Sequence, residues 1–198
     1  MVTSGSCETR PFPVADLNGH PADVAPRLLE ALLICGGRVG RIIEVEAYGG
    51  ADDPASHAHR RRTQRNSSMF EAPGTLYVYR SYGIHWCANV VCDRVGEAGA
   101  VLIRAVEPLA GIEEMRQARP RARRDVDLAN GPGKLCAALA ITDDDDGTDV
   151  LSATSRVRLR RDHRLPPDRP PASPRIGISA ATDRLWRYTV RDHGGLSR

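Results

Sequence analysis

The residues best suited to chemistry lie between positions 41 and 89, around a short run of alternating polar and apolar side chains. In residues 41–48, Glu44 and Glu46 fall on one face of a predicted strand. A carboxylate held there can bind and deprotonate a water molecule if its pKa lies below the operating pH. Arg104, at the end of a second predicted strand, can pair with it and keep it ionised. The simpler interpretation is that both glutamates form the solvated face of an edge strand, because carboxylates usually face water.

Aromatic side chains gather in the same stretch, since four of the chain's five tyrosines fall within it. Tyr77 and Tyr79 share one face of a predicted strand, where tyrosine is also common as an ordinary packing residue. Tyr82 precedes Gly83 in a predicted turn, so its ring should project outward. Such a ring can act as a wedge between stacked bases, and aromatic faces can hold a flat ligand.

The loop that follows the glutamates carries two histidines, His57 and His59, which are two residues apart and have no evident third metal ligand. We therefore predict no metal site at these histidines. A metal-dependent hydrolase that uses these histidines with Glu44, Asp52 and Asp53 remains an alternative hypothesis.

Strands and helices that lack a regular βαβ alternation must position these residues. This pattern predicts the α+β class, with a mainly antiparallel, curved sheet and packed helices. We expect one compact domain over residues 11–198, after a flexible tail over residues 1–10. The expected helices span residues 23–33, with Asp23 as N-cap, 109–119 and 135–141. The expected strands span residues 76–79, 84–91, 100–106, 150–151, 157–159, 175–178 and 185–190.

Composition narrows the class of protein. The 41% apolar and 27% charged residues are typical of a soluble globular chain, and no apolar run approaches the length of a membrane span. We expect a cytoplasmic protein, associated with the nucleoid if it is bacterial. Its five cysteines include no Cys-x-x-Cys pair, which disfavours a disulfide framework and a zinc ribbon and favours reduced thiols.

Charge is unevenly distributed along the chain. Arginine clusters at residues 60–65, 116–124 and 156–164 suit contact with phosphate, although arginine-rich surfaces are also common without a ligand. The single lysine, Lys134, stands at a predicted helix start, where free backbone N–H groups could help it to hold a phosphate. We expect the acidic run 143–146 to lie on the side away from any polyanion.

A series of motifs runs in order along most of the chain. It comprises Glu44-Val-Glu46-Ala-Tyr48, His57, Arg65-Asn66-x-x-Met69-Phe70, Gly74-x-Leu76-Tyr77-Val-Tyr79, Tyr82-Gly83, Cys87-Ala-Asn89, Leu102-Ile-Arg104-Ala, Gly131-Pro-Gly-Lys134-Leu-Cys and Arg175-Ile-Gly-Ile178. Together these motifs resemble the alkyladenine (3-methyladenine) DNA glycosylase family. The resemblance implies a monofunctional enzyme of base excision repair, which flips alkylated or deaminated purines out of duplex DNA and removes them hydrolytically without a cofactor.

The resemblance also implies catalytic and base-binding residues. Glu46 would be the general base for a water that Arg104 also holds. Tyr48 and Tyr79, with His57, would sandwich the extruded base. A further residue, Asn89, would lie at the pocket floor and exclude the amino group of normal guanine.

The expected partner is double-stranded DNA that contains damaged purines, bound by a monomer. Tyr82 would enter the minor groove and fill the hole left by the base, and the other predicted DNA-binding residues are Ile84, His85, Arg65 and Lys134. A non-catalytic nucleic-acid-binding module of the same fold is the second alternative hypothesis.

Overall fold

The computed structural model of the chain describes residues 9–197, in which nine strands join one open, curved sheet with antiparallel pairing. Along the main path the order is β1 (Arg10–Pro11), β7 (Val157–Arg161), β2 (Leu32–Cys35), β3 (Arg38–Tyr48), β6 (Ala100–Ala110), β5 (His85–Val91) and β4 (Leu76–Ser81). Two short strands lie off this path, β8 (Ala172–Ser173) and β9 (Arg187–Thr189). The predicted α+β class and single compact domain are confirmed.

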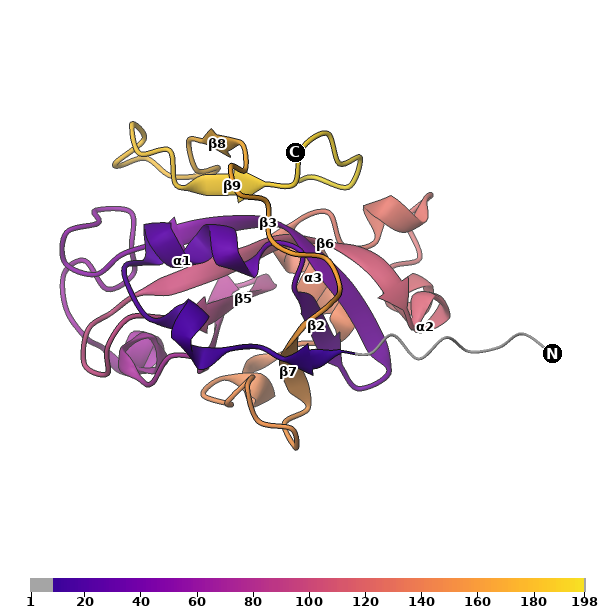
Figure 1. Cartoon of the computed structure of the whole chain (residues 1–198), viewed down its shortest axis with the longest axis horizontal. Helices are drawn as coiled ribbons and strands as arrows, with labels where there is room; N and C mark the ends of the chain where they lie inside the picture. Colours follow the sequence, from indigo (N-terminus) through magenta and orange to yellow (C-terminus); the bar gives the residue numbers. More distant parts are fainter. Residues whose placement is uncertain (1–8, 198) are drawn as a thin grey trace.

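Strand β3 is the centre of the sheet. One edge pairs with β6 along nearly its whole length, and the other pairs first with β2 and then, from Glu44 to Glu46, with β9. Figure 1 shows β9, in yellow, lying beside β3 close to the C-terminus. The edge-strand interpretation of the two glutamates is therefore wrong, because a segment from the far end of the chain covers them.

Both faces of β3 are buried, which differs from the predicted half-buried strand. Ile43, Val45, Glu44 and Glu46 are all fully inaccessible to solvent. Of the apolar residues of β3, Val45 and Ala47 join the main core, which also includes Leu28, Leu33 and Leu135. The opposite face therefore holds buried carboxylates, and each of these needs partners of opposite charge.

Three short helices pack on the sheet: α1 (Pro21–Leu28) against β3, α2 (Ile112–Ala118) against α3, and α3 (Pro132–Leu139) against β5 and β6. Short 3₁₀ turns occupy Val14–Leu17, Gln64–Phe70, Asp125–Asp127 and Asp143–Asp145. No helix in residues 9–197 is long and apolar enough to span a membrane.

The first helix differs from its prediction at both ends. It begins at Pro21, where His20 Nδ1 accepts the Ala22 N–H, so Asp23 is not the N-cap. It ends at Leu28, and the last two residues of the predicted helix, Leu32 and Leu33, belong instead to β2 and pair with β3 and β7. Sheet pairing thus overrides the helical period of these residues.

Several strand boundaries also differ from their predictions. Strand β6 continues beyond residue 106 to Ala110, and β9 covers only half of the predicted strand at 185–190. The predicted strands at 150–151 and 175–178 do not form. Residues 1–8 of the predicted tail lie outside the described residues, whereas Arg10, also assigned to that tail, pairs with Arg161. The four described cysteines, Cys35, Cys87, Cys92 and Cys136, are buried free thiols as predicted, and Cys7 lies outside the described residues.

Candidate active site

The Glu46 carboxylate is held by three hydrogen bonds that come from three parts of the chain. Its Oε2 accepts Tyr48 Oη at 2.8 Å and Arg104 Nη1 at 3.1 Å, while its Oε1 accepts the Ile176 N–H at 2.7 Å. A carboxylate offers about four acceptor positions. One position, on Oε1, is therefore left for a further donor such as water.

Glu44, on the same face of β3, anchors the other edge of the Arg104 guanidinium. Its Oε1 accepts Arg104 Nε at 3.1 Å and Arg187 Nε at 2.7 Å. Ser197 adds its N–H to Oε2 at 2.6 Å and its hydroxyl to Oε1 at 2.7 Å. Two arginines thus balance the two buried glutamates, which is the condition for keeping charges in the interior.

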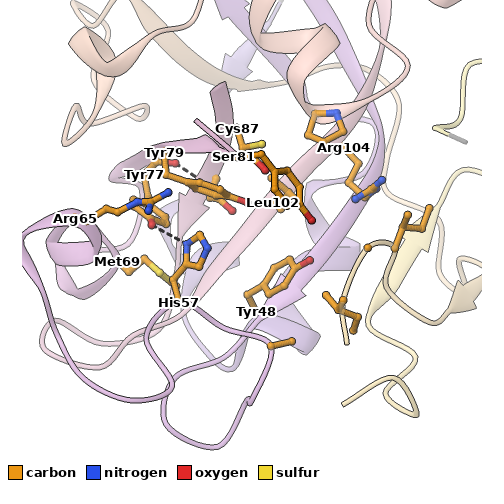
Figure 2. A pocket seen from close by; sticks show the side chains of 17 residues that line it. Tyr48, His57, Arg65, Met69, Tyr77, Tyr79, Ser81, Cys87, Leu102 and Arg104 are labelled. Atoms are coloured by element: carbon orange, nitrogen blue, oxygen red, sulfur yellow. Dashed lines mark hydrogen bonds between the residues drawn. The ribbon is translucent and has the colours of Figure 1, made fainter. Parts of the chain in front are cut away.

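A cavity of about 450 Å³ opens beside this network. Figure 2 shows Tyr48, His57, Tyr79 and Arg104 around the same open space. Seven of the residues predicted from the sequence line it: Tyr48, His57, Arg65, Tyr79, Tyr82, Asn89 and Arg104. Glu46 lies behind this lining and reaches it through Tyr48 and Arg104.

The aromatic wall of the cavity is a connected group. The His57 ring meets Tyr79 edge to face at a centroid distance of 4.4 Å, and Tyr79 stacks on Tyr77 at 5.5 Å. His57 Nδ1 and Tyr77 Oη form a hydrogen bond of 3.0 Å. Burial raises the pKa of both tyrosines far above the physiological range, so their hydroxyls stay protonated.

His57 is kept neutral although part of its ring meets solvent. Desolvation by the surrounding side chains, and then the positive charge of Arg65, lower the pKa of His57 below its ordinary value of 6.5. The cavity wall therefore carries no histidine charge near neutral pH. The other ring nitrogen of His57, Nε2, takes no part in the bond to Tyr77 and is available for a ligand.

Tyr48 forms another wall and is supported from behind by a buried ion pair. The Arg175 guanidinium lies 4.7 Å from the centre of the Tyr48 ring and donates two hydrogen bonds to Asp53, at 2.6 and 2.8 Å. Both side chains of the pair are fully buried. Burial alone would raise the pKa of Asp53, but the bonds from Arg175 and from the Gly49 N–H lower it below its ordinary value.

The hairpin between β4 and β5 carries the predicted wedge. Tyr82 is 89% exposed and has a φ of 49°, a left-handed conformation that is unusual for tyrosine. Gly83 follows with a φ of 69°, and Ile84 N–H donates to the Ser81 carbonyl at 3.0 Å, which makes the tip a type I′ turn. Ile84 is also well exposed, so an apolar, strained tip stands at the cavity mouth.

The structure does not place every predicted residue in the cavity lining. Ile84 and His85 lie on the hairpin beside it, and a Cβ on Gly133 would come within 2.7 Å of the His85 Cβ, so the start of α3 presses against the hairpin. Lys134 Nζ donates to Asn130 Oδ1 at 2.8 Å and lines a neighbouring recess with several arginines. Asn89 is fixed by a bond from its Nδ2 to the Tyr77 carbonyl.

The sequence did not reveal several contributors to the site. Residues 176–178 line the cavity without forming the predicted strand, and the Ile176 contact to Glu46 is made by backbone, which no residue type signals. Ser197 gave no signal either, because its partner Glu44 is 153 residues away.

The residues of the metal-dependent alternative are not assembled. Asp53 is bound to Arg175, and Glu44 to Arg104 and Arg187. In the part of the chain that the structure describes, no three His, Cys, Asp or Glu side chains form a group that could hold a metal ion. The acidic run is also bound within the fold, since Asp145 pairs with Arg156 and Asp146 accepts from Ser68.

Comparison with known proteins extends over nearly all of the chain. A family model described as methylpurine-DNA glycosylase (MPG) matches residues 15–194. A relative from Burkholderia lata is 50% identical over 180 residues, which cover 90% of this chain and 87% of the relative. A relative from Nocardia farcinica is 46% identical over 189 residues, covering 93% of this chain and 89% of the relative. Both relatives bear the name "Putative 3-methyladenine DNA glycosylase".

Proposed function

This chain belongs to the methylpurine-DNA glycosylase family, and we propose that it flips damaged purines out of duplex DNA into the cavity beside Glu46. As a member of this family it is a DNA glycosylase for alkylated bases, which is a hydrolase of base excision repair. We further propose that it removes both alkylated and deaminated purines. It would act as a monomer in the cytoplasm, on the nucleoid in a bacterial cell.

The observation that carries this proposal is the free acceptor position on Glu46, next to an arginine that lines the cavity. A water bound there would give a proton to Glu46 as its oxygen attacks C1′ of the flipped nucleotide. The C1′–N bond breaks and its electron pair leaves with the base, so the products are the free base and an abasic site. The negative charge of the carboxylate also stabilises the positive charge that develops on the sugar in the transition state.

The walls of the cavity support recognition of an electron-poor base. Tyr48 on one side and Tyr79 with His57 on the other offer aromatic faces to a planar ring, and such faces attract cationic bases. Since His57 is neutral, it would not repel an alkylated purine that carries a positive charge. Asn89, fixed at the Tyr77 carbonyl, is proposed to exclude the amino group of normal guanine.

The DNA contacts proposed around the cavity use the exposed hairpin and nearby cations. Tyr82 would enter the minor groove and occupy the space vacated by the base, with Ile84 and His85 beside it. Arg65 at the cavity mouth and Lys134 in the neighbouring basic recess would contact backbone phosphates.

Base release from defined duplexes tests this function. Labelled DNA with one hypoxanthine or one ethenoadenine, together with methylated DNA, is incubated with the chain in EDTA, and abasic sites are developed with alkali. We expect strand breaks only after alkali and none from Glu46→Gln. DNA binding without any base release would instead favour the non-catalytic module, and activity lost in EDTA would favour the metal-dependent hydrolase.

A further inference from the structure

The end of the described chain returns to the catalytic face of β3. After β9, the Val190 N–H donates to the Ile43 carbonyl at 2.9 Å, which fixes the path beside β3. Gly195 is buried there, and a Cβ at this position would lie 3.2 Å from Ile43 Cδ1. Its lack of a side chain therefore allows residues 195–197 to approach β3 closely.

The Ser197 hydroxyl has all of its hydrogen-bonding capacity filled. It donates to Glu44 Oε1 at 2.7 Å and accepts from Arg104 Nε at 3.2 Å and from Arg104 Nη2 at 3.1 Å. A hydroxyl can donate once and accept twice, so no bond of this group remains free. Ser197 thus joins Glu44 to two nitrogens of one guanidinium.

These contacts fix how Arg104 meets Glu46. With Nε and Nη2 held by Ser197 and Glu44, the guanidinium keeps Nη1 at 3.1 Å from Glu46 Oε2. One N–H of Nη1 and one of Nη2 have no partner among these contacts, and Arg104 lines the cavity. These two N–H groups are therefore available to a water or a nucleotide that enters the cavity.

We propose that Ser197 is a positioning residue for base release, which acts by fixing the orientation of the Arg104 guanidinium against Glu46. This inference rests on the proposed function. Ser197 does not line the cavity, so its effect would be exerted on the chemical step and not on the recognition of the base.

Replacement by alanine should leave the fold intact. The Ser197 N–H bond to Glu44 Oε2 needs no side chain, and Glu44 keeps Arg104 and Arg187 as charged partners. Arg104 loses its bond at Nη2 and one of two at Nε, so only Glu44 at Nε and Glu46 at Nη1 still hold its plane, which can tilt more easily. A misplacement of about 1 Å can slow chemistry by roughly a hundredfold, so we expect a smaller tilt of this guanidinium to cost roughly tenfold.

The test compares Ser197→Ala, Ser197→Thr and Ser173→Ala in single-turnover base release from a hypoxanthine duplex, with enzyme in saturating excess. Ser173→Ala is the matched control, because its hydroxyl accepts from Arg187, the other arginine bound to Glu44, and not from Arg104. We expect a rate at least about tenfold lower for Ser197→Ala. The affinity for the lesion duplex and the unfolding midpoint should stay close to wild type, Ser197→Thr should recover most of the rate, and the control should match wild type.

Three results would overturn the inference. A Ser197→Ala rate within twofold of wild type would do so, as would a loss that Ser197→Thr does not reverse. A parallel loss of duplex affinity and unfolding midpoint would indicate a purely structural role. If wild type itself released no base the proposed function would fail too, whereas full activity of both wild type and Ser197→Ala would overturn only the role of Ser197.

Discussion

The buried network around Glu46 and the exposed hairpin tip at Tyr82 border the same cavity but are built in opposite ways. Around Glu46, both carboxylates are inaccessible to solvent, and each is held by several hydrogen bonds. At the tip, Tyr82 is 89% exposed and adopts a left-handed backbone conformation. The comparison indicates that this fold holds rigid the groups proposed to carry out the chemistry, and stores backbone strain in the hairpin tip that is proposed to enter the DNA.

The largest effect should come from replacing Glu46, the proposed general base in the buried network. Glu46→Gln cannot take up a proton, so we expect single-turnover base release to fall by roughly a hundredfold to ten-thousandfold. Binding of lesion DNA should persist, because Glu46 does not line the cavity. A rate of base release within tenfold of wild type would mean that Glu46 is not the general base.

The support behind Tyr48 should matter to stability. Asp53→Asn leaves the buried Arg175 without its charged partner, and we expect the free energy of unfolding to drop by about 3 kcal/mol or more in urea titrations. The matched control is Glu71→Gln, which breaks an exposed pair with Arg62 at 2.8 Å and should cost less than about 1 kcal/mol. Equal losses in the two variants would show that burial of the Asp53 pair has no special weight.

The hairpin tip should affect DNA binding and not chemistry. Tyr82→Ser removes a ring that would stack in the duplex, so we expect lesion-duplex affinity to fall by roughly tenfold to a hundredfold. The rate on DNA that is already bound should change less. Leu165→Ser, another exposed apolar residue, is the control and should bind as wild type does. Unchanged affinity in Tyr82→Ser would remove the wedge from the proposal.

A different substitution of Tyr82 should increase the stability of the protein. Asparagine tolerates the left-handed conformation that tyrosine adopts here at some cost, so Tyr82→Asn is expected to raise the free energy of unfolding by about 1 kcal/mol. Thermal and urea unfolding would measure this gain. A variant that is less stable than wild type would show that the tip carries no strain.

The smallest effect concerns His57, whose pKa in the folded chain lies below its ordinary value of 6.5. Unfolded chains therefore bind this proton first as pH falls, and stability decreases from about pH 6.5 downward through the folded pKa. His57→Gln should lose less stability than wild type between about pH 7 and pH 5 in urea titrations. Identical losses would contradict a neutral, desolvated His57.

The sequence predicted the fold class and family correctly because the evidence for both is local. Motifs such as Glu44-Val-Glu46-Ala-Tyr48 can be recognised from neighbouring residues, and the polar alternation in them does produce a strand. The first helix was extended too far, because residues 29–33 have a helical period, whereas Leu32 and Leu33 pair with β3 and β7 as the start of β2.

The candidate site was predictable only where a side chain has a distinctive type. Tyr48, His57, Tyr79, Asn89 and Arg104 do lie around one cavity, although their proposed roles stay predictions. The burial of Glu44 and Glu46 could not be predicted, because β9 and residues 195–197 cover them from more than 140 residues away. The Ile176 N–H leaves no trace in sequence, since any residue other than proline supplies the same donor.

The bond between Glu44 and Ser197, across 153 residues, has a consequence for how the protein comes into being. During synthesis the earlier strands emerge from the ribosome first and can begin to pair. Glu44 then meets its final partners only after residue 197 has also emerged. A nascent chain would thus hold a nearly complete sheet while the proposed catalytic centre is still unfinished, and base release would become possible only after residues 195–197 have packed against β3.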